Sequence, residues 1–107
     1  MAEGTPRISK AFQAFMTEAP QHAQAWGAAI EGLAAATALD GKTSALAYLA
    51  VLAALRLESG VPFHVKAAKE AGASREEIIS AVLIGLPAAG NGVTACLPVA
   101  IEAFDSE

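Results

Sequence analysis

The residue with the most evident chemical capacity is His64, which follows Pro62 near the expected start of a helix. An imidazole titrates near neutral pH, so it can accept or donate a proton during a reaction. In the first turn of a helix, unpaired N–H groups and the positive end of the helix dipole disfavour a protonated ring. We therefore expect His64 to be neutral at pH 7 and to act as a general base.

Four neighbouring residues complete the site that we predict around this histidine: Glu58, Ser59, Gly60 and Phe63. Glu58 is the candidate second acid or base, and Phe63 would form one wall. Ser59 and Gly60 would leave room for a small-molecule ligand, whose carboxylate or lactone oxygen the helix N–H groups can bind. The structural alternative stays open: His64 would bond a carbonyl at a helix junction, and Glu58 would be a solvated helix end.

The other polar residues indicate neither a metal nor a cofactor site. His22 and His64 lack a third ligand at a recognisable spacing. Cys96 is the only cysteine, and we expect a buried structural residue rather than a nucleophile. The segment Gly90-Asn91-Gly92 lacks the lysine of a phosphate-binding loop. We therefore predict a site that works without cofactor or metal.

The composition indicates a single all-α domain that associates with copies of itself. The chain has 107 residues, which suits one domain. Alanine, the best helix former, supplies about a quarter of them. Hydrophobic residues make up 54% of the chain and charged residues only 17%, and a chain this short has limited interior to hide them. We therefore predict one domain over residues 1–107 with an apolar subunit interface.

Charge and hydropathy argue against several other partners. The net charge is −4 and no basic stripe is present, so nucleic acid is not expected to bind. The longest apolar run, 45–55, is too short to cross a bilayer, and no apolar leader opens the chain. A single cysteine fits a reducing compartment. We expect a cytoplasmic protein that binds neither membrane nor nucleic acid.

About six helices are expected to position these residues, joined by short turns. The signals are caps, prolines, glycines and apolar residues at three- and four-residue steps. Asp40-Gly41 is expected to close the second helix, and Ser74 with Glu77 to open the fifth as a capping box. Pro98 either kinks the last helix or delays its start. The expected ranges are a first helix from Thr5-Pro6, then 21–39, 43–58, 62–71, one from the capping box to Leu86, and 93–104.

The order of motifs from Lys42 to Gly92 resembles the carboxymuconolactone decarboxylase and alkylhydroperoxidase D superfamily. Lys42-Thr43 precedes a long apolar helix, and the chain then carries His64-x-x-x-Ala68-x-x-x-Gly72 directly before the Ser74 capping box. An Ala-Gly turn at residues 89–90 follows. The resemblance implies the all-helical alkylhydroperoxidase D-like fold and assembly as a homotrimer or homohexamer.

The same resemblance implies a site without the redox pair of the alkylhydroperoxidase branch. The two cysteine positions of that branch fall on Leu57 and Gly60, and its glutamate position falls on Ala45. Peroxide reduction by that route needs an attacking and a resolving thiol, which these residues lack. The lactone decarboxylase branch also lacks the pair, keeps the histidine and has an acidic residue shortly before it, where Glu58 stands here.

Three functions therefore remain open from the sequence. The first is a cofactor-free lyase or isomerase that uses His64 on a small oxo acid or lactone. The second is a non-catalytic oligomeric binding or scaffold protein that has kept the fold. The third, a peroxiredoxin or alkylhydroperoxidase activity, is disfavoured because the cysteine pair is missing.

Overall fold

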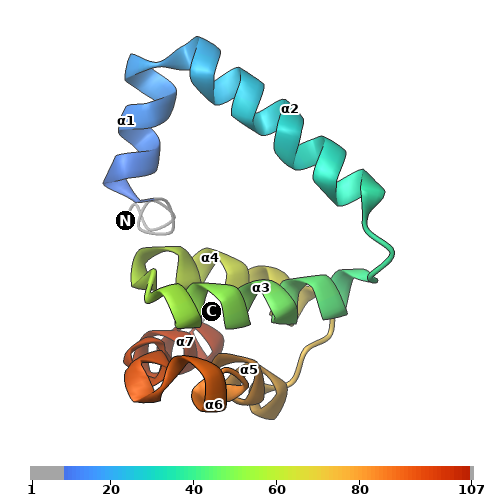
Figure 1. Cartoon of the computed structure of the whole chain (residues 1–107), viewed down its shortest axis with the longest axis vertical. Coiled ribbons are helices and arrows are strands. Elements are labelled where there is room, and N and C mark those ends of the chain that lie inside the picture. The colour runs from blue at the N-terminus through green and yellow to red at the C-terminus, as the bar shows by residue number, and fades with distance from the viewer. Residues whose placement is uncertain (1–8, 107) are drawn as a thin grey trace. The chain divides into compact units, whose positions relative to one another are not determined.

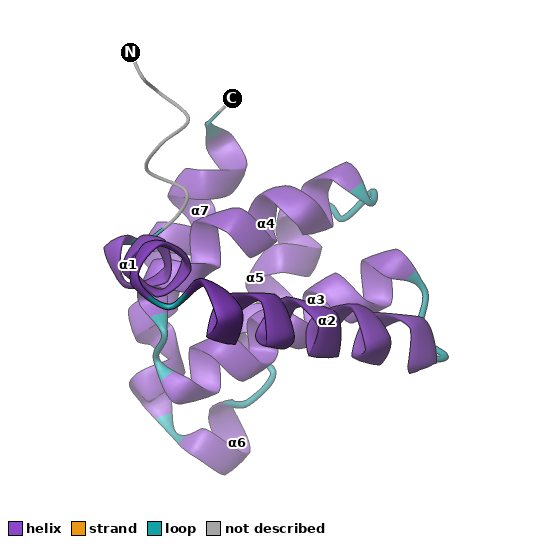
Figure 2. Cartoon of the chain, turned by 90° about the horizontal axis from the view of Figure 1, so that it is seen from above, coloured by secondary structure: helices purple, strands orange, loops and turns teal. Residues whose placement is uncertain are grey.

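The computed structural model describes residues 9–106, in which helices are joined by short turns and no strand is present (Figures 1 and 2). Six of the described helices have nine residues or more, as the sequence predicts. The chain divides between Leu39 and Asp40 into two units. Each unit is described by itself below, and the assignment of one domain to the whole chain stays a prediction.

The first unit consists of two helices, α1 (Lys10–Glu18) and α2 (Pro20–Ala36), joined at Ala19. Ser9 caps α1 with its side chain, which accepts a hydrogen bond from the Phe12 N–H at 3.1 Å. Proline opens α2, where its missing N–H costs nothing. The start predicted at Thr5-Pro6 lies outside the described residues. No residue of α1 or α2 is buried, although both carry large apolar side chains.

The second unit holds five helices: α3 (Gly41–Leu55), α4 (Val61–Glu70), α5 (Arg75–Leu83), the single turn α6 (Leu86–Ala89) and α7 (Leu97–Asp105). Two 3₁₀ helices, Glu58–Gly60 and Asn91–Cys96, precede α4 and α7. Helix α3 packs against α4, α5 and the second 3₁₀ helix, while α7 packs against α4 and α5 (Figure 2). No helix in the described part of the chain has the length and apolar character needed to cross a bilayer.

The core of the second unit is small and built from aliphatic side chains. Its largest fully buried members are Leu49, Val61, Val65, Ile78, Val82, Val93 and Cys96. Alanines fill the remaining space, which lets the helices approach closely. The predicted burial of Cys96 is confirmed, because its side chain is fully covered; its structural role stays a prediction. Leu86, expected in the core, is 38% exposed because the chain turns into α6 before it.

Several predicted helix ends are wrong. Helix α3 ends at Leu55 and α5 at Leu83, each three residues before its predicted end. Two further errors lie at the junction between the units. Helix α2 ends at Ala36 because Thr37 is extended and its hydroxyl accepts a hydrogen bond from the Leu39 N–H at 3.2 Å. Asp40 does not close α2 but caps α3, and its carboxylate accepts a hydrogen bond from the Thr43 N–H at 2.8 Å. An aspartate before glycine fits a turn or an N-cap equally well, so the local sequence does not separate the two.

The start of α5 confirms the predicted capping box. Ser74 accepts a hydrogen bond from the Glu77 N–H at 3.1 Å, and Glu77 accepts one from the Ser74 N–H at 2.9 Å. Glu77 also forms an ion pair with Lys42 at 3.0 Å, which ties α5 to the start of α3. For the last helix, the structure resolves the open alternative: Pro98 is the second residue of α7, so it delays the start and does not kink the helix.

The C-terminus of α3 is closed by Arg56 in the left-handed conformation, at φ 58° and ψ 41°. Its N–H bonds the Ala53 carbonyl at 3.1 Å, and the Leu57 N–H bonds the Leu52 carbonyl at 2.9 Å. This pair of bonds is the Schellman arrangement, in which glycine usually takes the left-handed position. A side chain there costs about 1–2 kcal/mol per residue. Arg56 therefore stores strain immediately before the predicted site.

Arg56→Gly is expected to raise the free energy of unfolding by about 1 kcal/mol, because glycine adopts the left-handed conformation without that cost. Urea unfolding followed by circular dichroism measures the change. Arg56→Ala is the matched control: it also removes the guanidinium but keeps the Cβ, so it should give no such gain. Equal stabilisation by both substitutions would show that the charge, and not the backbone, is responsible.

Candidate functional site

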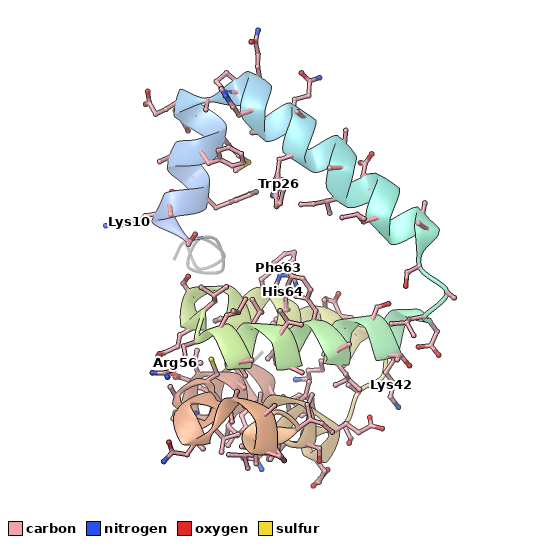
Figure 3. The ribbon with its side chains drawn as sticks, in the orientation of Figure 1. Lys10, Trp26, Lys42, Arg56, Phe63 and His64 are labelled. Carbon is pink, nitrogen blue, oxygen red and sulfur yellow. The ribbon has the colours of Figure 1, made fainter. Side chains whose placement is uncertain are left out.

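The predicted histidine lies in an aromatic setting within the second unit (Figure 3). The Tyr48 ring, from α3, lies 4.4 Å from the His64 ring between centroids, with the planes tilted by 44°. The Phe63 ring meets the same imidazole edge-on, at 5.1 Å and 84°. His64 is half-buried, while Tyr48 and Phe63 are 49% and 51% exposed. The imidazole therefore has two aromatic neighbours and is partly exposed.

This environment favours the neutral form of the imidazole. Burial lowers the pKa of His64 below its ordinary value of 6.5, because a charged ring loses hydration among apolar groups. No neighbouring charge contributes to that shift. A neutral ring carries one nitrogen that can accept a proton and one N–H that can donate. At pH 7 the side chain is thus in the protonation state that a general base requires.

Helix α4 places His64 through a specific chain path after α3. Arg56 ends α3, the 3₁₀ turn Glu58–Gly60 follows, and α4 starts at Val61 without a break. His64 is the fourth residue of α4, still in its first turn. Val61 is fully buried and fixes this start against the core. The position of the imidazole beside Tyr48 is therefore set by the packing of α4 on α3.

The start of α4 offers fewer free N–H groups than the sequence analysis expects. The Gly60 N–H bonds the Leu57 carbonyl at 3.2 Å, and the Val61 N–H bonds the Glu58 carbonyl. Pro62 has no N–H to donate. A 3₁₀ turn that runs directly into the helix uses the donors that would otherwise face a ligand. An anionic or carbonyl oxygen of a ligand would therefore be bound by side chains more than by the backbone N–H groups at the start of α4.

The remaining predicted residues lie around this turn with different orientations. Gly60 faces the core, since a Cβ built there would lie 3.6 Å from Cδ2 of Leu52, an ordinary contact. Ser59 and Glu58 are exposed. The carboxylate of Glu58 acts on Cys96, whose thiol pKa is raised first by burial and then by this negative charge. The structure thus brings Phe63 and His64 together and associates Glu58 with Cys96; a shared role of Glu58 and His64 stays a prediction.

Tyr48 is the neighbour that sequence reasoning missed. The tyrosine is the only one in the chain, which is the one signal that could have singled it out. Its place on a helix that is apolar nearly all round predicts packing rather than chemistry. Its contact with His64 follows from the way two helices cross, and residue spacing along the chain does not encode that crossing.

A separate groove of about 480 Å³ lies between α3 and α5, within the second unit. Its lining is mostly apolar and contains no residue of the predicted site: Thr43, Leu46, Ala47, Ala50, Glu77, Ser80, Ala81 and Ile84. Glu77 is engaged in the capping box and the ion pair with Lys42. The groove therefore suits an apolar group better than a reaction that needs a free acid or base.

The other histidine and the cysteine of the chain lie in different units. Within residues 9–106, no group of three histidine, cysteine or acidic side chains is placed to hold a metal ion. His22 lies on α2 of the first unit, and it is exposed. Cys96 is covered by the core of the second unit and its pKa is raised, so the reactive thiolate is disfavoured there.

Comparison with known proteins gives one match. No curated protein and no solved structure matches the chain. The sequence profile described as the carboxymuconolactone decarboxylase family matches residues 20–102, which is well over half of the chain. That range includes α2 as well as the helices that carry Tyr48, His64 and the capping box. The chain therefore belongs to the carboxymuconolactone decarboxylase family.

Proposed function

We propose that this protein is a cofactor-free lyase or isomerase in which His64 moves a proton on a small oxo acid or lactone. One observation carries the proposal: a half-buried imidazole with a lowered pKa contacts two aromatic rings. A carbon beside a carbonyl is acidic enough for a neutral imidazole to take its proton when the resulting enolate is stabilised. The ring can then return the proton at a second position.

In this mechanism the aromatic residues have different tasks. The free nitrogen of His64 removes the proton from the carbon, and the electron pair of that C–H bond moves to the carbonyl oxygen. The hydroxyl of Tyr48 is the candidate hydrogen-bond donor to the negative charge that develops on the carbonyl oxygen. Phe63 has no polar atom and serves to exclude water from one side. Ser59 and Gly60 stay as predicted ligand neighbours, and Glu58 as a predicted second acid or base.

The experiment that tests this function follows hydrogen exchange at carbon. The protein is incubated in D₂O with a panel of small oxo acids and carboxylated lactones, and loss of the C–H signal is followed by proton NMR. Exchange or product formation above the rate without protein, for at least one class, is expected. A panel on which the protein never exceeds the uncatalysed rate would contradict the proposal.

A non-catalytic binding or oligomeric scaffold protein is the second candidate, and one observation favours it. The apolar groove between α3 and α5 contains none of the predicted site residues, His64 included. A protein that only binds an apolar group would use such a groove. Retention of ligand binding and assembly in a His64→Gln variant, together with no exchange activity in the wild type, would favour this candidate.

Peroxidase activity ranks below both. The cysteine positions of the alkylhydroperoxidase branch fall on Leu57 and Gly60, and the remaining Cys96 is buried with a raised pKa. A one-cysteine route through that thiol would need the thiolate that burial disfavours. If the Cys96→Ala variant still reduces peroxide in the presence of a dithiol reductant, the reaction does not depend on a cysteine of this chain.

We also propose that the protein forms a homotrimer or homohexamer in the cytoplasm. The unburied apolar residues of α1 and α2 support self-association. A single buried thiol without a partner fits a reducing setting. Size-exclusion chromatography with light scattering gives the mass directly, and a monomer at micromolar concentration would contradict the assembly.

A further inference from the structure

The charge around His64 distinguishes between the two substrate classes of the proposed function. The imidazole contacts the rings of Tyr48 and Phe63, and burial, without a contribution from a neighbouring charge, lowers its pKa. A carboxylate that leaves water needs a cation or several hydrogen-bond donors in return, because its burial is otherwise costly. A carboxylated substrate therefore requires such a partner close to His64.

The backbone at the start of α4 offers few of these donors. The N–H groups of Gly60 and Val61 already bond the carbonyls of Leu57 and Glu58, and Pro62 has no N–H. The side chain of Glu58 is exposed and adds a negative charge to the same turn. A substrate carboxylate would therefore depend on a lysine or an arginine.

Three cations of the second unit are engaged in contacts with other groups. Lys42 pairs with Glu77 at 3.0 Å, which ties α3 to α5. Arg75 pairs with Asp105 at 2.9 Å, which ties α5 to α7. Lys69 donates a hydrogen bond of 2.7 Å to a carbonyl at the end of α7. These contacts hold helices together and leave the three charges committed.

The other two cations of this unit also point away from the imidazole. The guanidinium of Arg56 lies against Gly92, since a Cβ built on that glycine would lie 2.7 Å from Nε. Figure 3 places Lys42 and Arg56 at opposite ends of α3, while His64 lies beside its middle. Lys66 follows His64 by two residues on α4, and residues two apart do not face each other on a helix.

The described helices of the first unit carry little positive charge. Helix α2 has no lysine or arginine, and its titratable side chains are His22 and Glu31. Lys10 is the one cation of α1. Whether α2 of the same chain or of another copy approaches a His64, it therefore brings no cation to the site.

We propose that the substrate of this site is an uncharged lactone, whose carbonyl oxygen accepts a hydrogen bond from Tyr48, and that a carboxylate on the substrate is selected against. The inference rests on the proposed function and narrows its substrate class. The free nitrogen of His64 takes the proton from the carbon beside the carbonyl, and the electron pair of that bond moves to the carbonyl oxygen. The imidazolium and the enolate that result attract each other.

A carboxylate bound beside the imidazole would oppose the same step. An anion close to His64 favours the imidazolium and raises its pKa. A protonated ring has no nitrogen that can accept the proton. An uncharged substrate leaves the imidazole neutral and ready to act as the base.

A lactone that carries a carboxylate and the methyl ester of the same lactone test this selection, because the two differ mainly in charge. Both are unsaturated five-membered rings, and loss of the C–H signal in D₂O is followed by proton NMR. Each rate is divided by the rate without protein, which corrects for the different acidity of the two compounds. The ester should be favoured by about tenfold, since the carboxylate loses water without a partner. Equal rates, or a faster acid, would overturn the proposal.

Binding, measured on the ring signals of His64, separates this inference from the enzyme function. If neither compound exchanges, the enzyme function fails, and the two affinities still decide the inference. Shifts of the ring signals at lower concentrations of the ester than of the acid would support it. Tighter or equal binding of the acid, or no shift with either compound, would overturn it.

Two substitutions test whether a cation nevertheless reaches the substrate. Lys66→Gln removes the lysine that follows His64 on α4, and Lys10→Gln removes the cation of α1. Both variants should keep the wild-type ratio between ester and acid. Loss of exchange or binding on the acid alone, in either variant, would show that this lysine binds a substrate carboxylate and would contradict the proposal. Circular dichroism checks that both variants are helical.

Discussion

Replacing His64 with glutamine should lower the rate of hydrogen exchange on an accepted oxo acid or lactone by about 10²–10⁴-fold, the usual contribution of a positioned general base. Glutamine keeps a polar planar group of comparable length but has no nitrogen that accepts a proton at neutral pH. The contacts of Tyr48 and Phe63 with the ring hold the imidazole in place, so the loss should fall on turnover rather than on assembly. Rates measured by proton NMR in D₂O give the ratio.

The matched control is His22→Gln, which removes the other histidine of the chain from an exposed position on α2. This variant should exchange at the wild-type rate. Equal rates for wild type and His64→Gln would place the base elsewhere. Light scattering of both variants checks that the assembly is the same.

The pH dependence of the wild-type rate follows from the direction of the pKa shift. The base must be unprotonated, so the rate should rise with pH through the pKa of His64 and level off above it. Because burial lowers that pKa below 6.5, the rise should be complete near neutral pH. A rate that still climbs steeply above pH 7 would indicate a base with a higher pKa.

Replacing Leu49 with alanine should lower the free energy of unfolding by about 2–5 kcal/mol, the range measured for leucine truncations in packed cores. Leu49 is fully buried on α3, the helix that packs against both α4 and α5. Its loss leaves a cavity that the surrounding alanines are too short to fill. Since domains of this size are stable by only about 5–15 kcal/mol, much of the stability would be lost.

Urea unfolding followed by circular dichroism measures this change. Ile84→Ala is the control: it removes a comparable volume from a side chain that is 70% exposed, and should stay within about 0.5 kcal/mol of wild type. Similar losses for both substitutions would show that Ile84 is covered in solution, for example by a ligand or a partner on the groove that it lines.

Local chemistry explains which parts of the fold could be predicted from the sequence. The capping box of Ser74 and Glu77 was predictable because both bonds join residues three apart. Gly72 was predictable as the stop of α4 because glycine is the usual residue after the end of a helix. Its φ of 103° is one that other residues rarely adopt. Asp40 was assigned to the wrong helix because the same dipeptide serves as turn and as cap.

The candidate site was predictable only in part, because it depends on contacts between helices. His64 followed from residue type and position after Pro62, and Phe63 from adjacency. The contact with Tyr48 and the association of Glu58 with Cys96 depend on how α3, α4 and the second 3₁₀ helix pack. The sequence did not predict the 3₁₀ turn either, because Ser59-Gly60 also fits an open loop. This turn forms hydrogen bonds with N–H groups at the start of α4.

The most direct test of the site is the titration of His64 by NMR. The chain has two histidines, so comparison with His22→Gln assigns the ring signals. The aromatic setting predicts a midpoint below 6.5 for His64, because desolvation penalises the imidazolium. A midpoint at or above 6.5 would mean that the ring is hydrated or paired with a carboxylate, and it would contradict a neutral base in contact with Tyr48 and Phe63.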